Sequence, residues 1–258
     1  MKLKAILILS MVATTLVVAV FLLKTDRKPN SENITDVLGA PVTTANQKDV
    51  LYNGVTYRSQ WFEVKNADQI TLDSNLVEKL PANKIQETQD CRYLINAGFY
   101  TMDDKPIGYF LSGGQVLRSE IASPTFNGFF SINDMATPRI TNTLPLDHLR
   151  LALQSGPILI ENSFSQKLSI NNDKPARRSI VATTGENNTV FIVIYDAGSQ
   201  FNGPLLADLP EVLGVFQSEA DIVLADALNL DGGTASAFYT PEVGLSELSP
   251  IGGYFCIR

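Results

Sequence analysis

The sequence predicts an α+β fold, a single domain built around a mixed, largely antiparallel β-sheet with a few short helices. Short apolar runs rich in β-branched and aromatic residues dominate residues 50–258, and many of them end at Gly, Asn, Asp or Pro. Two of these runs, 179–184 and 189–195, lack a clean alternation of apolar and polar residues, which is typical of strands covered on both faces. Helical patterns are few and short.

The N-terminal segment 1–28 predicts export. Residues 5–23 form an uncharged, mostly apolar run, which as a helix spans about 28 Å, close to the hydrocarbon thickness of a bilayer. Lys2 and Lys4 precede it, as in an export signal. The segment is either an uncleaved membrane anchor or a cleaved signal peptide, with a buried core helix as the less favoured alternative. We therefore expect the domain on the periplasmic or extracellular face, held at the inner membrane if the segment stays uncleaved.

Residues 29–49 are polar and turn-rich without a sustained period, which predicts a linker before a domain that comprises residues 50–258. Apolar spacing and capping residues predict short helices over 74–80, 147–154 and 205–213. The expected strands lie in the runs 50–64, 92–100, 108–117, 127–132, 156–162, 178–184, 189–195, 221–230, 236–240 and 252–258.

Charge and composition exclude several classes of function. The chain has 20 Lys and Arg against 27 Asp and Glu, and because residues 1–28 hold five basic residues and one acidic residue, the rest carries −11. An acidic body repels phosphate backbones, so we expect no nucleic-acid partner. One His and two distant Cys exclude an ordinary His/Cys zinc site. We expect no cofactor, and no ligand spacing requires a divalent cation.

The two cysteines, Cys91 and Cys256, each lie next to a strand-like run. In an oxidising compartment they would form a disulfide that closes a long loop. Two buried thiols that pack as small apolar residues are the alternative. The sequence leaves both interpretations open, because it does not show whether the two strands are neighbours.

Polar residues and glycines gather at the ends of apolar runs. Asn229 and Asp231 share one face of a strand that breaks into Gly232-Gly233, where a backbone without Cβ atoms leaves room for a ligand. A plain turn with Asp231 capping its own backbone is the alternative. A second such unit is Asn96 to Tyr100 (NAGFY), for which a bulge or turn is the alternative.

Two further units precede strands. Gln154-Ser155-Gly156-Pro157 is a turn that enters a strand. Arg177 and Arg178 open another strand, where adjacent side chains point to opposite faces, so that at most one of them faces a given pocket. A pair of surface arginines is the alternative. A Ser-His-Asp triad is excluded, because His148 is the only histidine and no nucleophile-elbow motif is present.

These motifs, taken in order, resemble the phosphodiester glycosidase domain family, the bacterial relatives of the lysosomal mannose-6-phosphate uncovering enzyme. The residues that carry the resemblance are NAGFY (96–100), GYFLSGGQV (108–116), FNGFFSIND (126–134), QSGPILIENS (154–163), ARRSIVATT (176–184), TVFIVIYDAG (189–198) and ALNLDGGTASAFY (227–239). The family commonly has NLDGGGS where this chain has Thr234-Ala235-Ser236 after two glycines. Because a third glycine is missing, the backbone of this loop is expected to approach a ligand less closely than in the family, which also bears on the substrate.

The resemblance implies hydrolysis of a sugar-1-phosphodiester of the N-acetylglucosamine type. The leaving phosphate monoester has a second pKa of about 6 and needs little protonation, so the site has to supply positive charge and to stabilise an oxocarbenium-like sugar. The resemblance assigns Arg178 to the phosphate and Asp231 to the anomeric carbon, as base or nucleophile. It assigns substrate binding or close backbone approach to Asn96, Gly98, Ser155, Gly156, Asn229, Gly232 and Gly233.

A second carboxylate is expected among Glu161, Asp196 and Asp226, and the sequence favours none of them. The partner is a carbohydrate phosphodiester or a cell-envelope glycan, with the membrane as a further partner through residues 5–23. Two alternatives stay open: a non-catalytic envelope protein that binds glycan or peptidoglycan in the same pocket, and a glycosidase that acts on a cell-wall glycoside.

Overall fold

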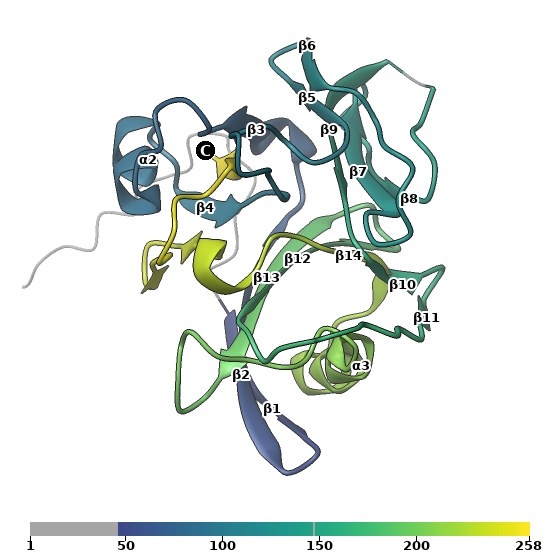
Figure 1. The fold of residues 1–258 in the computed structure, drawn as a ribbon. Helices are drawn as coiled ribbons and strands as arrows, with labels where there is room; N and C mark the ends of the chain where they lie inside the picture. The colour runs from purple at the N-terminus through teal and green to yellow at the C-terminus, as the bar shows by residue number, and fades with distance from the viewer. Residues whose placement is uncertain (1–45, 147) are drawn as a thin grey trace, which may run out of the picture. The chain divides into compact units, whose positions relative to one another are not determined.

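The structure is a computed structural model that describes residues 46–146 and 148–258 (Figure 1). Its fold is mostly β, with three sheets of seven, five and five strands, and every strand pair in the described part of the chain is antiparallel. The expected predominance of antiparallel pairing is confirmed, whereas the expected mixed character is not, because no parallel pair occurs among the described strands. The structure has three sheets where we expected one. Helices contribute little, so only the β part of the expected α+β class is confirmed.

The seven-stranded sheet has an edge hairpin and two central strands that are buried along almost their whole length. Asn53 and Gly54 join the hairpin strands with φ of 48° and 78°, as a two-residue hairpin turn requires. Its strands follow the order β1 (Asn46–Tyr52), β2 (Val55–Val64), β13 (Thr189–Asp196), β12 (Arg178–Thr184), β14 (Leu224–Asn229), β10 (Ile158–Glu161) and β11 (Phe164–Ser165).

The two five-stranded sheets are built from short strands. One follows the order β16 (Gly244–Leu245), β15 (Phe238–Tyr239), β4 (Tyr93–Asn96), β17 (Gly253–Ile257) and β3 (Ile70–Ser74). The other follows the order β6 (Gln115–Arg118), β5 (Phe110–Ser112), β9 (Leu149–Ser155), β7 (Gly128–Asn133) and β8 (Pro138–Thr141).

Buried phenylalanines from all three sheets meet in one core. Phe191 of β13 lies 5.1 Å from Phe255 of β17, measured between ring centroids. Phe130 of β7 lies 5.5 Å from the same Phe255 ring. Aromatic rings at these separations bury large apolar areas and pack with specific geometry. The contacts therefore fix the three sheets relative to one another.

Helix α3 (Leu209–Ala220) covers the other face of the seven-stranded sheet (Figure 1). Its buried Leu213 and Phe216 pack against residues such as Ile192, so both faces of β12 and β13 are covered, as their sequences predict. The helix expected over 205–213 is thus present, but it begins at Leu209, next to Pro210, and continues to Ala220.

Two other expected helices are wrong. Residues 149–154 belong to β9, where Leu151 and Leu153 are part of the core and Arg150 is only partly buried. The Arg150 guanidinium donates to the carbonyls of Ile70 and Ala67 at 2.9 and 2.7 Å. Residues 75–80 form turns, and the helix α2 (Ala82–Thr88) follows them.

The cysteines form a disulfide, so the first of the two interpretations is confirmed. Cys256 lies in β17, which pairs with β4, and Cys91 lies two residues before the start of β4. The two Cα atoms are 5.3 Å apart, and the bridge joins residues 165 positions apart in sequence. The covalent bond thus ties β17 to the segment that leads into β4, the strand before one of the loops of the site described below.

The expected segment 1–28, and all of the expected linker except its last four residues, lie outside the described residues. Strand β1 begins at Asn46, so residues 46–49 are part of the seven-stranded sheet. In the range from 46 onward that the structure covers, no helix has the length and apolar character needed to span a membrane.

Candidate active site

Asp231 lies in a pocket formed where two of the sequence motifs meet. The pocket has a volume of about 370 Å³ and is lined by the loop 99–104, which follows β4, and by residues 231–235, which follow β14, with Ser249 at its side. NAGFY and NLDGG are far apart in sequence, yet residues of both line one cavity. Loops at strand ends, held by a rigid sheet scaffold, are frequent positions for functional residues.

The backbone of Asp231 is held by the end of β4. Its N–H donates to the carbonyl of Ala97 at 3.1 Å, and its own carbonyl accepts a hydrogen bond from Asn96 Nδ2 at 2.7 Å. Its carboxylate Oδ1 accepts from the N–H of Gly232 at 2.9 Å. The position of the carboxylate is therefore set by main-chain groups on both sides.

A chain of buried polar side chains supports Asn96 from behind. Ser179 Oγ donates to Asn96 Oδ1 at 2.7 Å and lies 2.8 Å from Ser236 Oγ. Ser236 Oγ in turn accepts from Arg177 Nε at 3.0 Å. Arg177 is fully buried, which lowers the pKa of its guanidinium to about 10 and leaves it charged at neutral pH. A satisfied network of this kind rigidifies its surroundings.

Burial raises the pKa of Asp231 to about 7, and the hydrogen bond from the Gly232 N–H opposes this shift only in part. Asp231 as a whole residue is still partly exposed, and it lines the pocket. No Lys or Arg is among the described residues that line the pocket, so no cation there favours the ionised form. Asp231 thus exchanges its proton near neutral pH, which suits a group that acts as an acid or a base.

Tyr100 and Asp104 face the same pocket. The Tyr100 hydroxyl donates to the carbonyl of Pro250 at 2.6 Å, and burial, followed by the charge of Asp231, raises its pKa. Asp104 forms an ion pair with Lys79 at 2.6 Å. The pocket therefore holds two carboxylates, one buried without a cation and one paired, together with a phenol that stays neutral at physiological pH.

Two glycines allow this packing. A Cβ on Gly252 would lie 2.4 Å from Cδ1 of the Tyr100 ring, so the ring occupies the space that a side chain would need. A Cβ on Gly232 would lie 2.9 Å from the carbonyl oxygen of Arg177, and the N–H of Gly233 donates to that same oxygen at 2.8 Å. The loop after β14 therefore rests directly on the backbone that leads into β12.

A family model for phosphodiester glycosidases matches residues 89–253, a span that includes both walls of the pocket and the strands that carry them. The chain belongs to the phosphodiester glycosidase family. No match to an individual curated protein sequence was found.

Solved structures share the fold of this phosphodiester glycosidase domain. The zebrafish N-acetylglucosamine-1-phosphodiester α-N-acetylglucosaminidase catalytic domain, auto-inhibited by its pro-peptide, matches with a TM-score of 0.66 at 14% identity, over 86% of this chain and 85% of that one. A hypothetical protein from Synechocystis matches with a TM-score of 0.55 at 14% identity, over 85% and 64%. A putative exported protein from Burkholderia pseudomallei matches with a TM-score of 0.54 at 9% identity, over 79% and 74%.

The structure does not bring Arg178 into the pocket of Asp231. Its Nε donates to the carbonyl of Pro204 at 3.0 Å, and its Nη2 donates to the carbonyl of Lys174 at 2.7 Å and to Asp173 at 3.3 Å. Most of the guanidinium is buried in these contacts, and burial lowers its pKa. In this phosphodiester glycosidase domain, Arg178 ties the start of β12 to the segments around it.

Three of the expected site residues, Asn229, Ser155 and Gly156, form hydrogen bonds with one another and do not line the pocket. Ser155 Oγ and the N–H of Gly156 donate to the carbonyl of Asn229 at 2.7 and 3.1 Å, and Asn229 Nδ2 donates back to the Gly156 carbonyl at 2.9 Å. Gly98 is buried next to Leu153, with no position in the pocket wall. Of the expected site residues, only Asp231 and Gly232 line this pocket directly.

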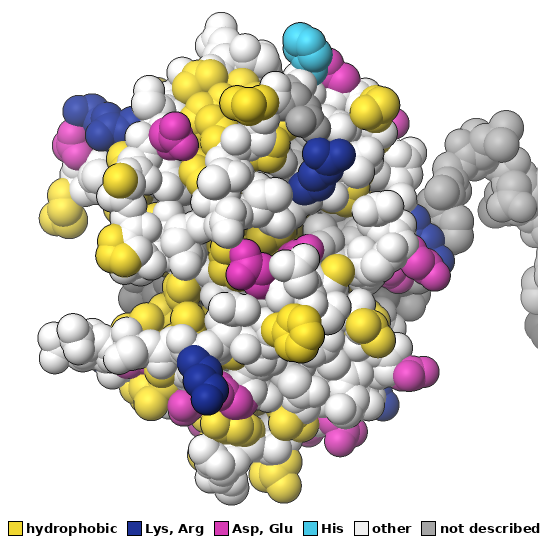
Figure 2. All heavy atoms as spheres, turned by 90° about the vertical axis from the view of Figure 1, so that its right-hand side faces the viewer, with side chains coloured by type: hydrophobic (Ala, Val, Ile, Leu, Met, Phe, Trp, Pro, Cys, Tyr) yellow, Lys and Arg dark blue, Asp and Glu magenta, His cyan; other side chains and the backbone are white. Residues whose placement is uncertain are grey.

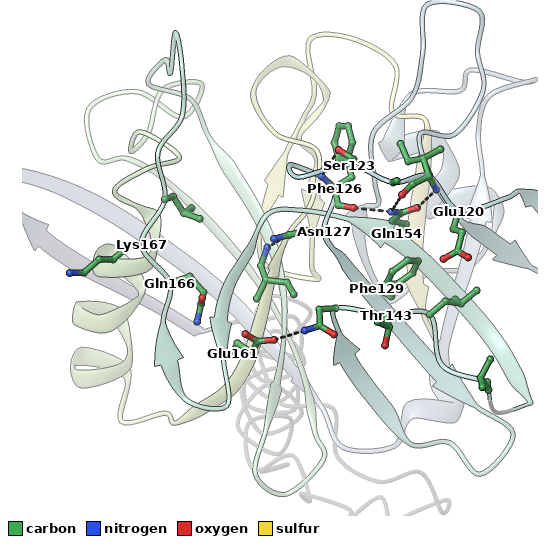
Figure 3. Close-up of a pocket in the computed structure, with 17 residues that line it drawn as sticks. Glu120, Ser123, Phe126, Asn127, Phe129, Thr143, Gln154, Glu161, Gln166 and Lys167 are labelled. Atoms are coloured by element: carbon green, nitrogen blue, oxygen red, sulfur yellow. Dashed lines mark hydrogen bonds between the residues drawn. The ribbon is translucent and has the colours of Figure 1, made fainter.

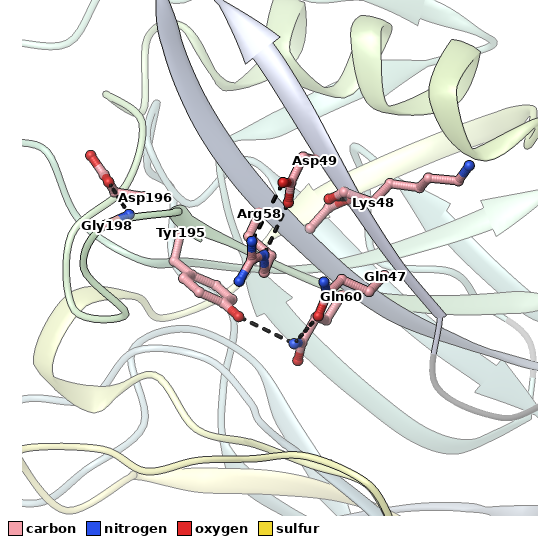
Figure 4. A network of polar contacts seen from close by, with 9 residues as sticks. Gln47, Lys48, Asp49, Arg58, Gln60, Tyr195, Asp196 and Gly198 are labelled. Atoms are coloured by element: carbon pink, nitrogen blue, oxygen red, sulfur yellow. Dashed lines mark hydrogen bonds and ion pairs between the residues drawn. The ribbon is translucent and has the colours of Figure 1, made fainter.

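The three expected second carboxylates lie elsewhere. Asp196 accepts from the N–H of Gly198 at 2.7 Å and caps a turn beside β2 (Figure 4). Asp226 accepts from the N–H of Asn162 at 2.8 Å, and Glu161 lines a different cavity. Sequence reasoning missed Asp104, although the polar run TMDDK directly after NAGFY is the signal that marks a loop rich in carboxylates.

Thr234, which replaces the third glycine of the family pattern, is exposed and lines the pocket. Its φ is not positive, whereas Gly233 has a φ of 62°. The backbone at 234 therefore does not need a glycine. The Thr234 carbonyl accepts hydrogen bonds from the N–H groups of Leu248 and Ser249 at 2.7 and 2.9 Å, and these bonds hold the loop in place. The Thr234 side chain occupies space in the pocket that a glycine would leave free.

Within residues 46–146 and 148–258, no three His, Cys, Asp or Glu side chains form a group that could hold a metal ion.

Proposed function

We propose that this protein hydrolyses a sugar-1-phosphodiester of the N-acetylglucosamine type and releases the sugar from an anomeric phosphate. The observation that carries the proposal is Asp231, a carboxyl group with a pKa near 7 in a pocket of a phosphodiester glycosidase domain. The similarity to the zebrafish catalytic domain, whose name states such an activity, supports the choice of substrate.

The chemistry of the pocket fits this reaction. The bond that breaks joins the anomeric carbon to a phosphate oxygen, and the leaving phosphate monoester has a second pKa of about 6, so it departs with little protonation. Asp231 in its ionised form either takes the proton of an attacking water or attacks the anomeric carbon itself. Asp104 is the second carboxylate that we assign to the site, because it lines the same pocket.

The remaining expected residues receive positioning roles in this proposal. Asn96 fixes the carbonyl of Asp231, and Asn229 braces the end of β14 through Gly156. Arg178 organises the start of β12 through Pro204 rather than holding the phosphate. Lys79, paired with Asp104, is the cation that we assign to the phosphate oxygens, since it lines a smaller neighbouring pocket that shares Tyr100 and Asp104 with the pocket of Asp231.

We further propose that the protein is exported, with residues 5–23 as the export signal or anchor. A disulfide between Cys91 and Cys256 is consistent with an oxidising compartment. The substrate would then be a phosphodiester-linked glycan of the cell envelope.

The test compares turnover of an N-acetylglucosamine-1-phosphodiester with a reporter aglycone. We expect Asp231→Asn to lose about 100-fold or more in kcat/KM, because the variant cannot take up a proton or attack carbon. Asp196→Asn is the matched control, since it removes a carboxylate that caps a turn outside the pocket, and it should keep near-normal turnover.

Two results would contradict the proposal. Full turnover by Asp231→Asn would show that the Asp231 carboxylate takes no part in the reaction. No turnover by the unmodified protein, together with measurable binding of the same compound, would identify a glycan-binding protein instead.

A further inference from the structure

The structure holds a cavity that is separate from the pocket of Asp231. It has a volume of about 360 Å³ and is lined by residues of β3 and β9, by the turn between β5 and β6, and by Arg258. It shares no lining residue with the Asp231 pocket, nor with the larger cavity of about 880 Å³ beside that pocket, which Figure 3 shows. A cavity of this volume has the size that holds a small molecule.

Two arginines line one end of this cavity. Arg150 of β9 donates to the carbonyl of Ile70, the first residue of β3, at 2.9 Å. Arg258 directly follows β17, and its main-chain N–H donates to the carbonyl of Gln69 at 3.3 Å. The Nε of Arg258 donates to the carbonyl of Gln89 at 3.0 Å. Both arginines are therefore held at the level where β3 begins.

These two guanidinium groups keep most of their hydrogen-bonding capacity. A guanidinium group carries five N–H donors in a fixed fork. Within the described part of the chain, two carbonyls accept from the side chain of Arg150 and one accepts from that of Arg258. The Nε of Arg150 is buried and has no acceptor there. The remaining donors match a carboxylate, which accepts two N–H groups of one guanidinium at once.

Asp73 lines the same cavity at a different level of β3. In the pairing of β3 with β17, Asp73 lies opposite Tyr254 and Thr71 lies opposite Cys256. Because side chains alternate along a strand, Asp73, Thr71 and Arg258 lie on one face of the two strands, with Thr71 in the middle. Thr71 Oγ1 donates to Asp73 Oδ2 at 3.0 Å, which holds the carboxylate in place.

The opposite charges of this cavity do not meet. Elsewhere on the molecule charged side chains form ion pairs, as Arg58 does with Asp49, and several Lys and Arg side chains on the face shown in Figure 2 lie next to acidic ones. Asp73 and the two arginines form no ion pair with any residue that the structure describes. From Ile70 to Asp73 the strand rises about 10 Å, so the cavity lies between separated charges.

A ligand with the complementary charges matches this arrangement. A carboxylate group accepts hydrogen bonds from the guanidinium groups, and an ammonium group donates to Asp73. A purely anionic ligand would face Asp73 on a domain that is acidic as a whole, and a purely cationic ligand would face the two arginines. A molecule that carries both groups satisfies both ends and has no net charge.

We propose that this cavity binds a small zwitterion, with its carboxylate against Arg150 and Arg258 and its ammonium group against Asp73. The class comprises amino acids whose two charged groups lie at opposite ends of a short chain. This binding does not depend on the hydrolysis proposed above, because the two sites have no lining residue in common.

The first experiment measures binding by calorimetry with three probes of the same chain length. γ-Aminobutyrate carries both charges, butyrate carries only the negative one, and butylamine carries only the positive one. We expect γ-aminobutyrate to bind the unmodified protein about tenfold or more tightly than either of the other two, because only it satisfies both ends of the cavity. No binding of γ-aminobutyrate, or binding of butyrate or butylamine with equal affinity, would overturn the inference.

The second experiment repeats the titrations with variants that remove one charge each. Asp73→Asn should bind γ-aminobutyrate and butyrate within about twofold of each other, and Arg258→Gln should bind γ-aminobutyrate about tenfold more weakly than the unmodified protein does. Asp68→Asn and Arg118→Gln are the matched controls, since both side chains are exposed and neither lines the cavity. Urea unfolding checks that each variant is folded. Affinities of Asp73→Asn and Arg258→Gln equal to those of the controls would place the zwitterion elsewhere and overturn the inference.

Discussion

Asn96 Nδ2 donates a hydrogen bond of 2.7 Å to the main-chain carbonyl of Asp231, across 135 positions of sequence. The same Nδ2 also donates to the Ala97 carbonyl, while Oδ1 accepts from Ser179 Oγ and from the N–H of Ala237. The amide of Asn96 therefore has no capacity left for a substrate. Asn96 acts through Asp231, and a test of that role needs a readout that reports on the carboxyl group itself.

Asn96→Ala should lower both stability and turnover. It leaves the Asp231 carbonyl, Ser179 Oγ and the N–H of Ala237 without their partner, at a cost of about 1–3 kcal/mol in the free energy of unfolding. We also expect kcat to fall and the pH dependence of kcat/KM to shift, because the carboxyl group moves. Urea unfolding and a pH–rate profile measure these effects. Asn66→Ala, which removes an exposed cap of a 3₁₀ turn, is the control, and an unchanged profile in Asn96→Ala would remove Asn96 from the site.

The activity should rise with pH through about 7. Burial raises the pKa of Asp231 to about 7, and both roles proposed for this carboxyl group, base or nucleophile, require the ionised form. Below pH 7 the protonated form predominates, so kcat/KM is expected to fall about tenfold per pH unit well below the pKa. Stopped assays from pH 4 to 9 measure this limb. Activity that is flat between pH 5 and 8 would contradict the assignment.

Asp231→Asn should stabilise the fold at neutral and higher pH. Because the pKa is raised in the folded state, the unfolded chain loses this proton first as the pH rises, so wild-type stability decreases between about pH 4 and pH 7 and then levels off. Asparagine has no proton to lose and retains an acceptor for the Gly232 N–H. Above pH 7 the variant should therefore be more stable by roughly 2–4 kcal/mol, and near pH 4 the difference should vanish. Urea titrations at the two pH values measure it, and a difference independent of pH would rule out the raised pKa.

Gly252→Ala should reduce turnover by displacing Tyr100. The added Cβ would lie 2.4 Å from the tyrosine ring, so the ring has to move from the wall of the Asp231 pocket. We expect kcat/KM to drop about tenfold or more. Gly214→Ala is the control, since a Cβ at that position of α3 has open space and raises helix propensity. If both variants turn over substrate equally, Tyr100 has no part in shaping the pocket.

The strands of the fold could be predicted where local sequence decides the outcome. The apolar runs at 178–184 and 189–195 become β12 and β13. The single run expected over 50–64 is wrong in one respect, because the Asn53-Gly54 turn divides it between β1 and β2. The helix expected over 147–154 was wrong because a short apolar run fits the residue spacing of a helix and of a strand equally well. The hydrogen bonds from the Arg150 guanidinium to the carbonyls of Ala67 and Ile70 join distant segments, so the local sequence does not reveal them.

The site could be predicted only in part. Asp231 was found because a carboxylate before two glycines at a strand end is a local signal. The contact partners of Arg178 and the grouping of Asp104 with Asp231 depend on how distant segments pack. An arginine next to a strand has the same sequence signature whether it faces a ligand or, as here, the carbonyls of Pro204 and Lys174.

The strand order of the second sheet has a consequence for synthesis. β4, which carries Asn96, is paired on one side with β15 and on the other with β17, which follows β4 by more than 150 residues. A ribosome-bound nascent chain that ends before residue 253 therefore cannot complete the sheet from which Asn96 reaches Asp231. Such high sequence separation makes this pairing a slow, late event. We therefore expect the pocket of Asp231 to form only after translation has passed β17.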